Sequence, residues 1–321
     1  MPTRRIIVLD GNTLNPGDIS WGPFEALGEL EVHPRSSAEE VLTRARGCEL
    51  VLTNKALLPK STLEQLPQLE YIGVLATGTN VVDVQAAKER GVVVTNVPEY
   101  GTRAVAQHVF ALLLEMTNHT AAHGAAVERG DWARCADFTF TVAPINELEG
   151  KTLGVVGLGA IGGAVARLGH AIGMHLLAAT NQRSRPDVGV PVRWLSLDEL
   201  LHHADVVSLH CPLSAATERL MDATRLNQMR GDAYLVNTSR GQLIDESALR
   251  RALDAGHLAG AALDVLSAEP PPSDHPLIGA PRCLITPHVA WASVAARQRL
   301  MQTAAKNLQC FLEGEPQNVV S

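Results

Sequence analysis

Short apolar runs alternate with stretches of helical periodicity along almost the whole chain. In the first third, apolar runs occur at 6–9, 50–52, 71–75 and 92–94. Runs this short, separated by helical segments, predict a parallel sheet with helices on both faces. The alternation restarts later, with runs at 152–156, 176–179, 206–209, 233–236, 261–263 and 283–285. The chain is therefore predicted to be α/β, with two Rossmann-like, doubly wound parallel-sheet domains.

Capping residues mark several helix boundaries. Ser37, Ser61 and Ser196 are each followed by glutamate three residues later, which is the pattern of a capping box at a helix N-terminus. Gly47 and Gly91 follow predicted helices and are expected to end them. These signals predict helices between the strands of both domains.

Two longer helices are predicted from their apolar residues. The stretch Val105 to Glu115 is apolar on nearly every face, which predicts a buried helix, and we expect it between the two domains. The stretch Ser293 to Leu312 is amphipathic and is followed by Gly314 and Pro316. We expect this second helix to return to the first domain, because the first sheet otherwise lacks a cover of that length.

The segment 130–149 carries three aromatic side chains, Trp132, Phe138 and Phe140, without clear periodicity. Aromatic residues are enriched in protein interfaces, so one interpretation is an excursion anchored on a partner subunit. A loop packed on its own domain explains the same pattern equally well.

Composition and charge exclude several classes of protein. The hydrophobic fraction of 46% is enough for two cores. The 27 basic and 34 acidic residues give a net charge of −7 without a basic stripe, so nucleic acid is not expected as a partner. Five scattered cysteines without a C-x-x-C pair argue for a reducing compartment and against disulfides or structural zinc. No stretch approaches about eighteen apolar residues, so we expect a cytoplasmic protein that does not enter the membrane.

The second alternation begins with a glycine motif directly after its first apolar run. Gly157, Gly159 and Gly162 have the spacing G-x-G-x-x-G, and a helical stretch follows them. In that context Gly157 permits a tight turn, Gly159 leaves room for a pyrophosphate, and Gly162 lets the helix pack against the strand. The phosphates would bind the helix N-terminus at Ala160 and Ile161. A purely structural strand-to-helix turn has the same spacing, but the flanking strand and helix favour a dinucleotide site.

The loop after the next predicted strand bears on the choice of cofactor. A dinucleotide fold usually has an acidic residue about twenty positions beyond the glycines, where it binds the ribose hydroxyls. Here the loop contains Thr180, Asn181, Gln182, Arg183 and Arg185, and no acid. The threonine and asparagine can hydrogen-bond a 2′-phosphate, and either arginine can pair with it. The loop therefore favours NADP(H), with NAD(H) possible, and a solvated loop with incidental arginines is the alternative.

Three further features follow predicted strands and so belong to the carboxyl edge of the sheet, where ligands bind. Arg240 comes directly after a buried strand and presents a planar fork of donors suited to a carboxylate. His288 follows a proline, and Glu269 is the strand-end carboxylate best placed to orient its ring for acid/base work. A structural ion pair would explain the arginine alone, and a surface position would explain the histidine alone. The three together favour a catalytic site.

In their order and spacing, these motifs resemble the D-isomer-specific 2-hydroxyacid dehydrogenases, and within them the glycerate dehydrogenase, or hydroxypyruvate/glyoxylate reductase, branch. The matching motifs are Gly157-x-Gly159-x-x-Gly162, Val236-Asn237-Thr238-Ser239-Arg240-Gly241, Asp264-Val265-Leu266-Ser267-x-Glu269-Pro270 and Thr286-Pro287-His288. The resemblance extends over nearly the whole chain.

The resemblance implies roles for individual residues. Arg240 would bind the substrate carboxylate and carbonyl, His288 would be the acid/base, and Glu269 would tune it. The backbone of Ala76, Thr77 and Gly78 would hold the substrate carboxylate. The implied cofactor contacts are Asp264 at the nicotinamide carboxamide, Cys211 and Pro212 at the adenine ribose, and Thr238, Ser239 and His288 in the same site.

The resemblance also implies a domain arrangement and a reaction. A discontinuous substrate-binding domain, 1–99 with 292–321, would hold an inserted dinucleotide-binding domain, 100–291, in a homodimer that uses no metal. The reaction would transfer a hydride between NAD(P)H and a small 2-keto acid, giving a D-2-hydroxy acid, with hydroxypyruvate or glyoxylate favoured. A D-lactate-type or 2-ketogluconate-type reductase fits the same residues, as does a non-catalytic, nucleotide-sensing corepressor. Many relatives carry Asp where Thr180 stands, so a preference for NAD is not implied.

Overall fold

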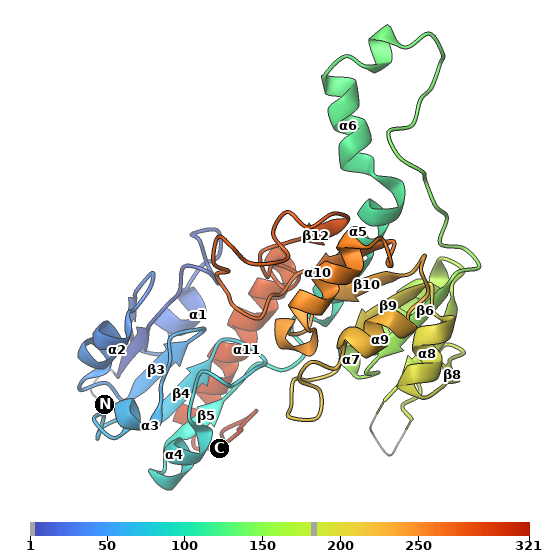
Figure 1. Ribbon diagram of the computed structural model, residues 1–321. Coiled ribbons are helices and arrows are strands. Elements are labelled where there is room, and N and C mark those ends of the chain that lie inside the picture. The colour runs from blue at the N-terminus through green and yellow to red at the C-terminus, as the bar shows by residue number, and fades with distance from the viewer. Residues whose placement is uncertain (1–3, 181–184) are drawn as a thin grey trace. The chain divides into compact units, whose positions relative to one another are not determined.

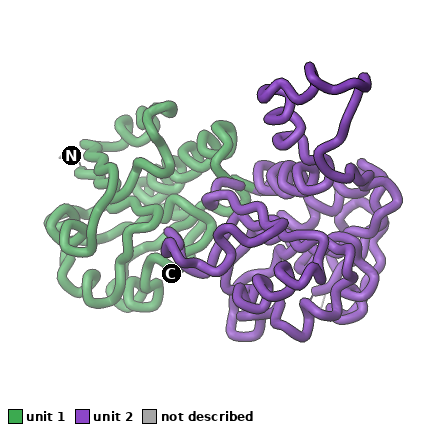
Figure 2. The backbone as a smooth tube through the Cα atoms, turned by 45° about the horizontal axis from the view of Figure 1, so that its top comes forward, with its two compact units in different colours: residues 1–101, 291–321 green, residues 102–290 purple. Residues whose placement is uncertain are grey.

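A computed structural model of the chain describes residues 4–180 and 185–321. The chain divides into two compact units, shown in different colours in Figure 2. Unit 1 consists of Met1–Gly101 and Trp291–Ser321, and unit 2 of Thr102–Ala290. Each unit contains its own parallel sheet, which confirms the predicted α/β fold class.

The sheet of unit 1 has five parallel strands in the order β2-β1-β3-β4-β5. The strands are β1 (Arg5–Val8), β2 (Glu29–Val32), β3 (Leu50–Thr53), β4 (Tyr71–Val74) and β5 (Val93–Thr95). The order reverses between β1 and β3, which is the doubly wound pattern. Four of these strands coincide with the predicted apolar runs. The pattern missed β2 because this edge strand includes Glu29 and Glu31 and is only partly buried.

Helices cover both faces of this sheet. They are α1 (Gly22–Glu25), α2 (Ala38–Ala45), α3 (Lys60–Leu63), α4 (Val84–Glu89) and α11 (Val294–Leu312). Buried residues of α2, α3 and α4 form one apolar core with the sheet, and those of α1 and α11 form the other. The long helix α11 therefore covers one face of the first sheet (Figure 1), which is the position predicted for it.

Of the two helix N-termini predicted in unit 1, the one at Ser37 is confirmed and the one at Ser61 is not. Ser37 forms a complete capping box at α2, because its side chain accepts from the Glu40 N–H and its own N–H donates to Glu40. The box predicted at Ser61 is wrong. Helix α3 starts earlier, since the carbonyl of Pro59 already accepts hydrogen bonds from the backbone N–H groups of residues 62 and 63. Ser61 therefore lies inside the first turn.

The sheet of unit 2 has seven parallel strands in the order β12-β11-β10-β9-β6-β7-β8. They are β6 (Thr152–Val156), β7 (His175–Ala179), β8 (Arg193–Trp194), β9 (Val206–Leu209), β10 (Tyr234–Asn237), β11 (Gly260–Leu263) and β12 (Cys283–Ile285). The order reverses between β6 and β9, and ligands of such sheets bind at the carboxyl edge at this switch point. The sequence pattern missed β8, which has only two residues.

Helices also cover both faces of the second sheet. They are α5 (Thr102–Asn118), α6 (Thr120–Glu128), α7 (Ala160–Ala171), α8 (Leu197–His203), α9 (Ala223–Gln228) and α10 (Glu246–Asp254), with short 3-10 turns η1 (Trp132–Arg134) and η2 (Gly241–Leu243). Helices α5 and α7 share one apolar core, and α8, α9 and α10 share the other. Helix α5 packs within unit 2, against α7, β10 and β11. Its burial is less complete than predicted, because Leu114 is 43% exposed.

Helix α6 and the segment after it extend away from the sheet of unit 2 (Figure 1). The sequence pattern did not predict this helix. Phe138 is 89% exposed, and the Trp132 indole donates to the Phe138 carbonyl within the same segment at 3.0 Å. The segment therefore does not fit the interpretation of a loop packed on its own domain. Among the described residues, no helix has both the length and the apolar character needed to span a bilayer.

Candidate active site

A glycine turn joins β6 to α7 at the switch point of the second sheet. Gly157 has φ +91°, a left-handed conformation that favours glycine. A Cβ at this position would lie 2.7 Å from the backbone nitrogen of Cys211, which follows β9. The missing side chain therefore lets the loops after β6 and β9 approach each other, as the backbone bond from the His210 N–H to the Val156 carbonyl at 2.7 Å also shows.

The other two glycines of the motif have different surroundings. A Cβ at Gly159 would meet no other atom within 4 Å, so a ligand can approach the backbone there. A Cβ at Gly162 would lie 2.1 Å from the carbonyl oxygen of Gly157, so only glycine lets the helix pack this closely. Helix α7 begins at Ala160 and Ile161, where N–H groups have no partner inside the helix and the dipole favours an anion. These residues fit the pyrophosphate of a dinucleotide.

The loop after β9 begins with His210, which is half-buried. His210 Nε2 lies 2.7 Å from the Ser208 hydroxyl, and burial lowers the pKa of His210 to about 4, so the ring is neutral near pH 7. The next residues are Cys211, whose thiol pKa is raised by burial, and Pro212, whose carbonyl accepts from the Thr217 hydroxyl at 2.7 Å. Both predicted adenosine contacts thus lie in a hydrogen-bonded loop beside the glycine turn.

The predicted cofactor-selecting loop is described only at its ends. Thr180 directly follows β7, whereas Asn181, Gln182 and Arg183 lie outside the described residues. The guanidinium carbon of Arg185 lies 5.6 Å from the ring centroid of Trp194, which is cation–π geometry. One of the two arginines considered for the 2′-phosphate therefore has an aromatic contact that the sequence did not reveal.

The turn after β10 presents Arg240 at the carboxyl edge. Asn237 is fully buried and holds the turn, since its side chain accepts from the Ser239 N–H at 3.0 Å and donates to the Arg240 carbonyl at 2.8 Å. The Thr238 hydroxyl is buried and has no hydrogen-bond partner among the described residues, as expected of a group that faces a ligand. Arg240 itself is exposed and donates to the Ser239 carbonyl at 2.8 Å.

The structure brings Glu269 and His288 together. His288 Nδ1 lies 2.7 Å from Glu269 Oε2, with side chains 28% and 35% exposed. The other carboxylate oxygen of Glu269 accepts from the Leu266 N–H at 3.0 Å, which orients it. A carboxylate at Nδ1 favours the tautomer with its proton there, so Nε2 is the ring atom that can exchange a proton.

The backbone of the loop that carries His288 is held by Asp264, at the end of β11. Its buried carboxylate accepts from the N–H groups of Val289 at 2.9 Å and Ala290 at 2.8 Å, and from the Thr286 hydroxyl at 2.6 Å. Burial alone would raise the pKa of Asp264, but the hydrogen bonds outweigh it and hold the pKa below its ordinary value. These contacts give Asp264 a positioning role, and its predicted contact with the nicotinamide remains a prediction.

His108 is a neighbour of this loop that the sequence analysis did not single out. It lies on α5, with Nε2 3.0 Å from the Thr286 hydroxyl and 3.5 Å from Asp264 Oδ1. The available signal was a histidine in a largely apolar helix. Its partner could not be inferred, because α5 and Thr286 are distant in the sequence.

The predicted substrate loop belongs to unit 1 and follows β4. The Ala76 carbonyl accepts from the Val97 N–H at 3.0 Å, and the Thr77 hydroxyl donates to the Val97 carbonyl at 2.8 Å. The Asn96 side chain donates to the Thr77 carbonyl at 2.7 Å. These bonds tie the loop of Ala76, Thr77 and Gly78 to the chain that leaves β5.

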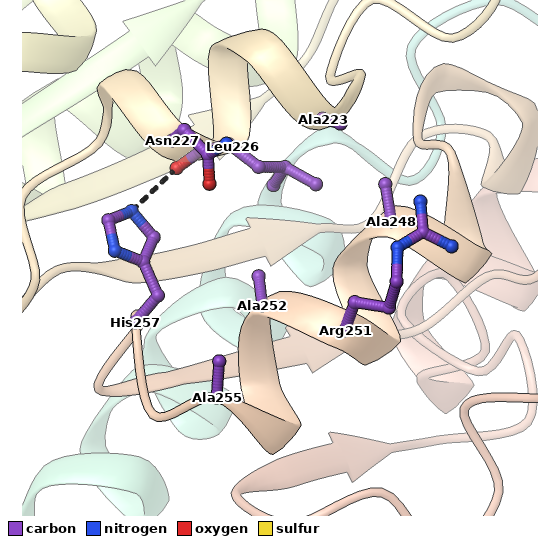
Figure 3. Close-up of a pocket in the computed structure, with 8 residues that line it drawn as sticks. All are labelled: Ala223, Leu226, Asn227, Ala248, Arg251, Ala252, Ala255 and His257. Atoms are coloured by element: carbon purple, nitrogen blue, oxygen red, sulfur yellow. Dashed lines mark hydrogen bonds between the residues drawn. The ribbon is translucent and has the colours of Figure 1, made fainter.

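A pocket of about 450 Å³ lies between α9 and α10 (Figure 3). It is lined by Ala223, Leu226, Asn227, Ala248, Arg251, Ala252, Ala255 and His257. His257 is tied to the Leu226 carbonyl, with Nε2 3.2 Å from the oxygen. None of these residues is a predicted site residue, so the pocket is not where the predicted chemistry would occur.

The chain is similar to known proteins over almost its whole length. The chain is 44% identical over 320 residues to the hydroxypyruvate reductase of Blautia hydrogenotrophica, and 37% identical over 321 residues to the glycerate dehydrogenase of Methylorubrum extorquens. Each alignment covers 99% of both chains. The structure also resembles the NADPH-dependent glyoxylate/hydroxypyruvate reductase of Sinorhizobium meliloti in complex with NADP and malonate. That likeness has a TM-score of 0.84 at 30% identity, over 99% of this chain and 97% of the other.

The family assignment itself covers the second unit. Residues 110–290 match the family described as D-isomer specific 2-hydroxyacid dehydrogenase, NAD binding domain. This range contains the glycine turn, Arg240, Glu269 and His288. The chain therefore belongs to the D-isomer-specific 2-hydroxyacid dehydrogenases, and it is an oxidoreductase with a nicotinamide-dinucleotide-binding domain.

Proposed function

We propose that the protein reduces hydroxypyruvate to the D-2-hydroxy acid D-glycerate, or glyoxylate to the achiral glycolate. The observation that carries the proposal is the pairing of His288 with Glu269 at 2.7 Å, in the same unit as Arg240 and the glycine turn. Unit 2 would bind the dinucleotide, and unit 1 would supply the substrate loop at Ala76, Thr77 and Gly78. The relatives named hydroxypyruvate reductase and glycerate dehydrogenase support this substrate class.

Three residues of this chain would have separate roles in the reduction of the carbonyl group. When bound, NAD(P)H would supply the hydride for the carbonyl carbon. His288 gives the proton from Nε2 to the carbonyl oxygen, so that the carbonyl group gains one hydride and one proton and becomes an alcohol. Glu269 holds the ring through Nδ1 and stabilises the charged imidazole before transfer. Arg240 binds the carboxylate with its planar fork and polarises the carbonyl.

The test is a substrate panel followed through nicotinamide absorbance. Hydroxypyruvate, glyoxylate, pyruvate and 2-ketogluconate are each offered with NADPH and with NADH. The proposal expects the largest kcat/KM with hydroxypyruvate or glyoxylate. A clear preference for pyruvate or 2-ketogluconate would move the protein to another branch of the family, and tight nucleotide binding with no turnover on any acid would favour a corepressor.

For the cofactor, we propose that NADPH is used at least as well as NADH. The support is Thr180 at the position where many relatives carry an acid, since a carboxylate there would repel a 2′-phosphate. Thr180→Asp combined with Arg183→Ala should raise the KM for NADPH by about ten- to a hundredfold, because a charged hydrogen bond contributes roughly 1.5–3 kcal/mol. The kcat at saturating nucleotide should not change. A wild-type preference for NADH of tenfold or more would overturn this assignment.

We also propose a homodimer that uses the extended segment of unit 2. Its exposed apolar side chains are Val127, Trp132, Phe138, Val142 and Ile145. Apolar residues gathered on an excursion of this kind are typical of a subunit contact. Sedimentation analysis should show a dimer in wild type and dissociation in Phe138→Asp. A monomeric wild type would refute the proposal.

The five free cysteines fit a reducing compartment, and we propose the cytoplasm.

A further inference from the structure

The turn that carries Glu269 is hydrogen-bonded to the largely buried carboxylate of Glu246, the first residue of α10. Glu246 Oε1 accepts from the Ser267 N–H at 2.7 Å, and Oε2 accepts from the Ser267 hydroxyl. The Glu246 side chain is only 12% exposed. Ser267 lies between Leu266, whose N–H binds Glu269, and Glu269 itself. Glu246 is therefore hydrogen-bonded to the middle residue of this turn.

A histidine completes the surroundings of this carboxylate. His275 is 4% exposed in its side chain, and its Nε2 lies 3.1 Å from Glu246 Oε2. Its Nδ1 accepts from the Leu277 N–H at 3.3 Å, so the ring proton is on Nε2 and is donated to Glu246. The carboxylate thus accepts from two groups of Ser267 and from His275. Hydrogen bonds of this kind, to a charged acceptor, are stronger than neutral ones.

The segment between Arg240 and Glu246 fixes the same turn in two more ways. The Gln242 side chain donates to the Ser267 carbonyl at 3.0 Å. A Cβ at Gly241 would lie 1.9 Å from the carbonyl carbon of Leu266, so the two backbones are in direct contact. One short segment therefore connects the substrate-binding arginine to the turn that carries Glu269.

Helix capping does not account for Glu246. The N-cap of α10 is Asp245, whose side chain accepts from the Ala248 N–H at 2.9 Å. Glu246 instead directs both carboxylate oxygens at the turn and at His275. We propose that Glu246 is a positioning residue, which fixes Ser267 so that Glu269 is aligned with His288. This inference rests on the proposed function, because it assumes that the aligned pair transfers a proton.

The test is Glu246→Gln in the full-length protein. Glutamine keeps the shape and one acceptor oxygen, but its NH₂ group accepts no hydrogen bond and so cannot replace the oxygen that accepts from the Ser267 hydroxyl and His275. We expect kcat for hydroxypyruvate to fall by about tenfold, because small misplacements of a reacting group cost one to two decades of rate. The KM for the nicotinamide nucleotide should stay within about twofold, since the glycine turn is not touched.

Glu199→Gln is the matched control. Glu199 accepts from the Ser196 N–H at 3.0 Å and from the Ser196 hydroxyl at 2.7 Å, the same pair of contacts that Glu246 makes with Ser267. It lies on α8, which carries no predicted site residue. Its kcat should equal that of wild type even if its melting temperature falls. A similar loss of kcat in both variants would mean that Glu246 supports the fold in general, and would overturn the inference.

A double variant separates positioning from independent action. In a Glu269→Gln background, Glu246→Gln should lower kcat by less than about twofold, because residues that act as a unit are not additive. Multiplied losses would overturn the inference. If Glu246→Gln does not fold, Ser267→Ala removes one of the same contacts and should show a smaller kcat loss with the same dependence on Glu269. Wild-type protein without keto-acid reductase activity would refute the proposed function, whereas active wild type and an equally active Glu246→Gln would refute this inference alone.

Discussion

Replacing Gly241 with alanine should separate the two loops that carry Arg240 and Glu269. The added Cβ would lie 1.9 Å from the Leu266 carbonyl carbon and 2.2 Å from the Ser267 nitrogen, whereas ordinary contact begins at 3.4 Å. Both obstacles are backbone atoms, so no side chain can rotate away, and the turn must move by about 1.5 Å. A displacement of that size at a reacting pair is expected to lower kcat/KM about a hundredfold.

The effect on stability should be more modest than the effect on rate. Overpacking of this kind typically costs about 1–3 kcal/mol, so most of the protein should remain folded at 25 °C. The assay measures kcat/KM for hydroxypyruvate, nucleotide affinity by fluorescence titration, and melting temperature. Gly231→Ala is the control, because the nearest atom to its added Cβ is the His257 carbonyl oxygen at 3.6 Å, which is ordinary contact. If Gly241→Ala keeps more than about half of the wild-type kcat/KM, the contact between the two loops does not hold the site together.

Three further predictions concern single residues. His288→Ala should lower kcat by about 10²- to 10⁴-fold with nucleotide affinity nearly intact, and retention of a tenth of the wild-type rate would end the acid/base assignment. Arg240→Lys should lower kcat/KM for the keto acid at least about tenfold, because lysine lacks the planar fork, and an unchanged value would make Arg240 structural. Asp264→Asn should reduce the free energy of unfolding at pH 7 by about 1–3 kcal/mol. Because the folded-state pKa of Asp264 is lowered, its contribution is present above the ordinary value of 3.8 and is lost as the pH falls through the lower folded value. The difference between wild type and Asp264→Asn in chemical denaturation should therefore shrink at acidic pH, and a constant difference from pH 7 to pH 3 would contradict this account.

The glycine turn could be predicted from the sequence because its requirements are local. The φ of +91° at Gly157 and the 2.1 Å approach at Gly162 depend on a strand, a turn and a helix that follow one another directly. The contact between the side chains of Glu269 and His288 was also predictable, because parallel strands bring their carboxyl ends to one edge of the sheet. The orientation of the ring was not, since it depends on the left-handed backbone of His288, φ +54°, and its bond to the Asp264 carbonyl.

Residues that support the site from elsewhere in the fold were beyond sequence reasoning. In the sequence, Glu246 looks like an ordinary acidic residue in the first turn of a helix. His108 looks like an isolated polar residue in a largely apolar helix. Their partners, Ser267 and Thr286, are 21 and 178 residues away along the chain. No local pattern specifies a contact of that kind. It becomes visible only when the sheet order places the loops after β10, β11 and β12 beside one another.

The site combines reacting groups that are at least partly exposed with supporting carboxylates that are fully buried at Asp264 and largely buried at Glu246. Placing a carboxylate in the interior is unfavourable unless its oxygens are fully hydrogen-bonded. Asp264 meets this condition with donors from Thr286, Val289 and Ala290, and Glu246 meets it with donors from Ser267 and His275. Removing either carboxylate leaves several donors of its loop without an acceptor. Each carboxylate therefore stabilises the conformation of a whole loop and not a single hydrogen bond. Because the two loops meet at the Glu269–His288 pair, the geometry of this pair depends on both carboxylates, although neither touches the imidazole side chain.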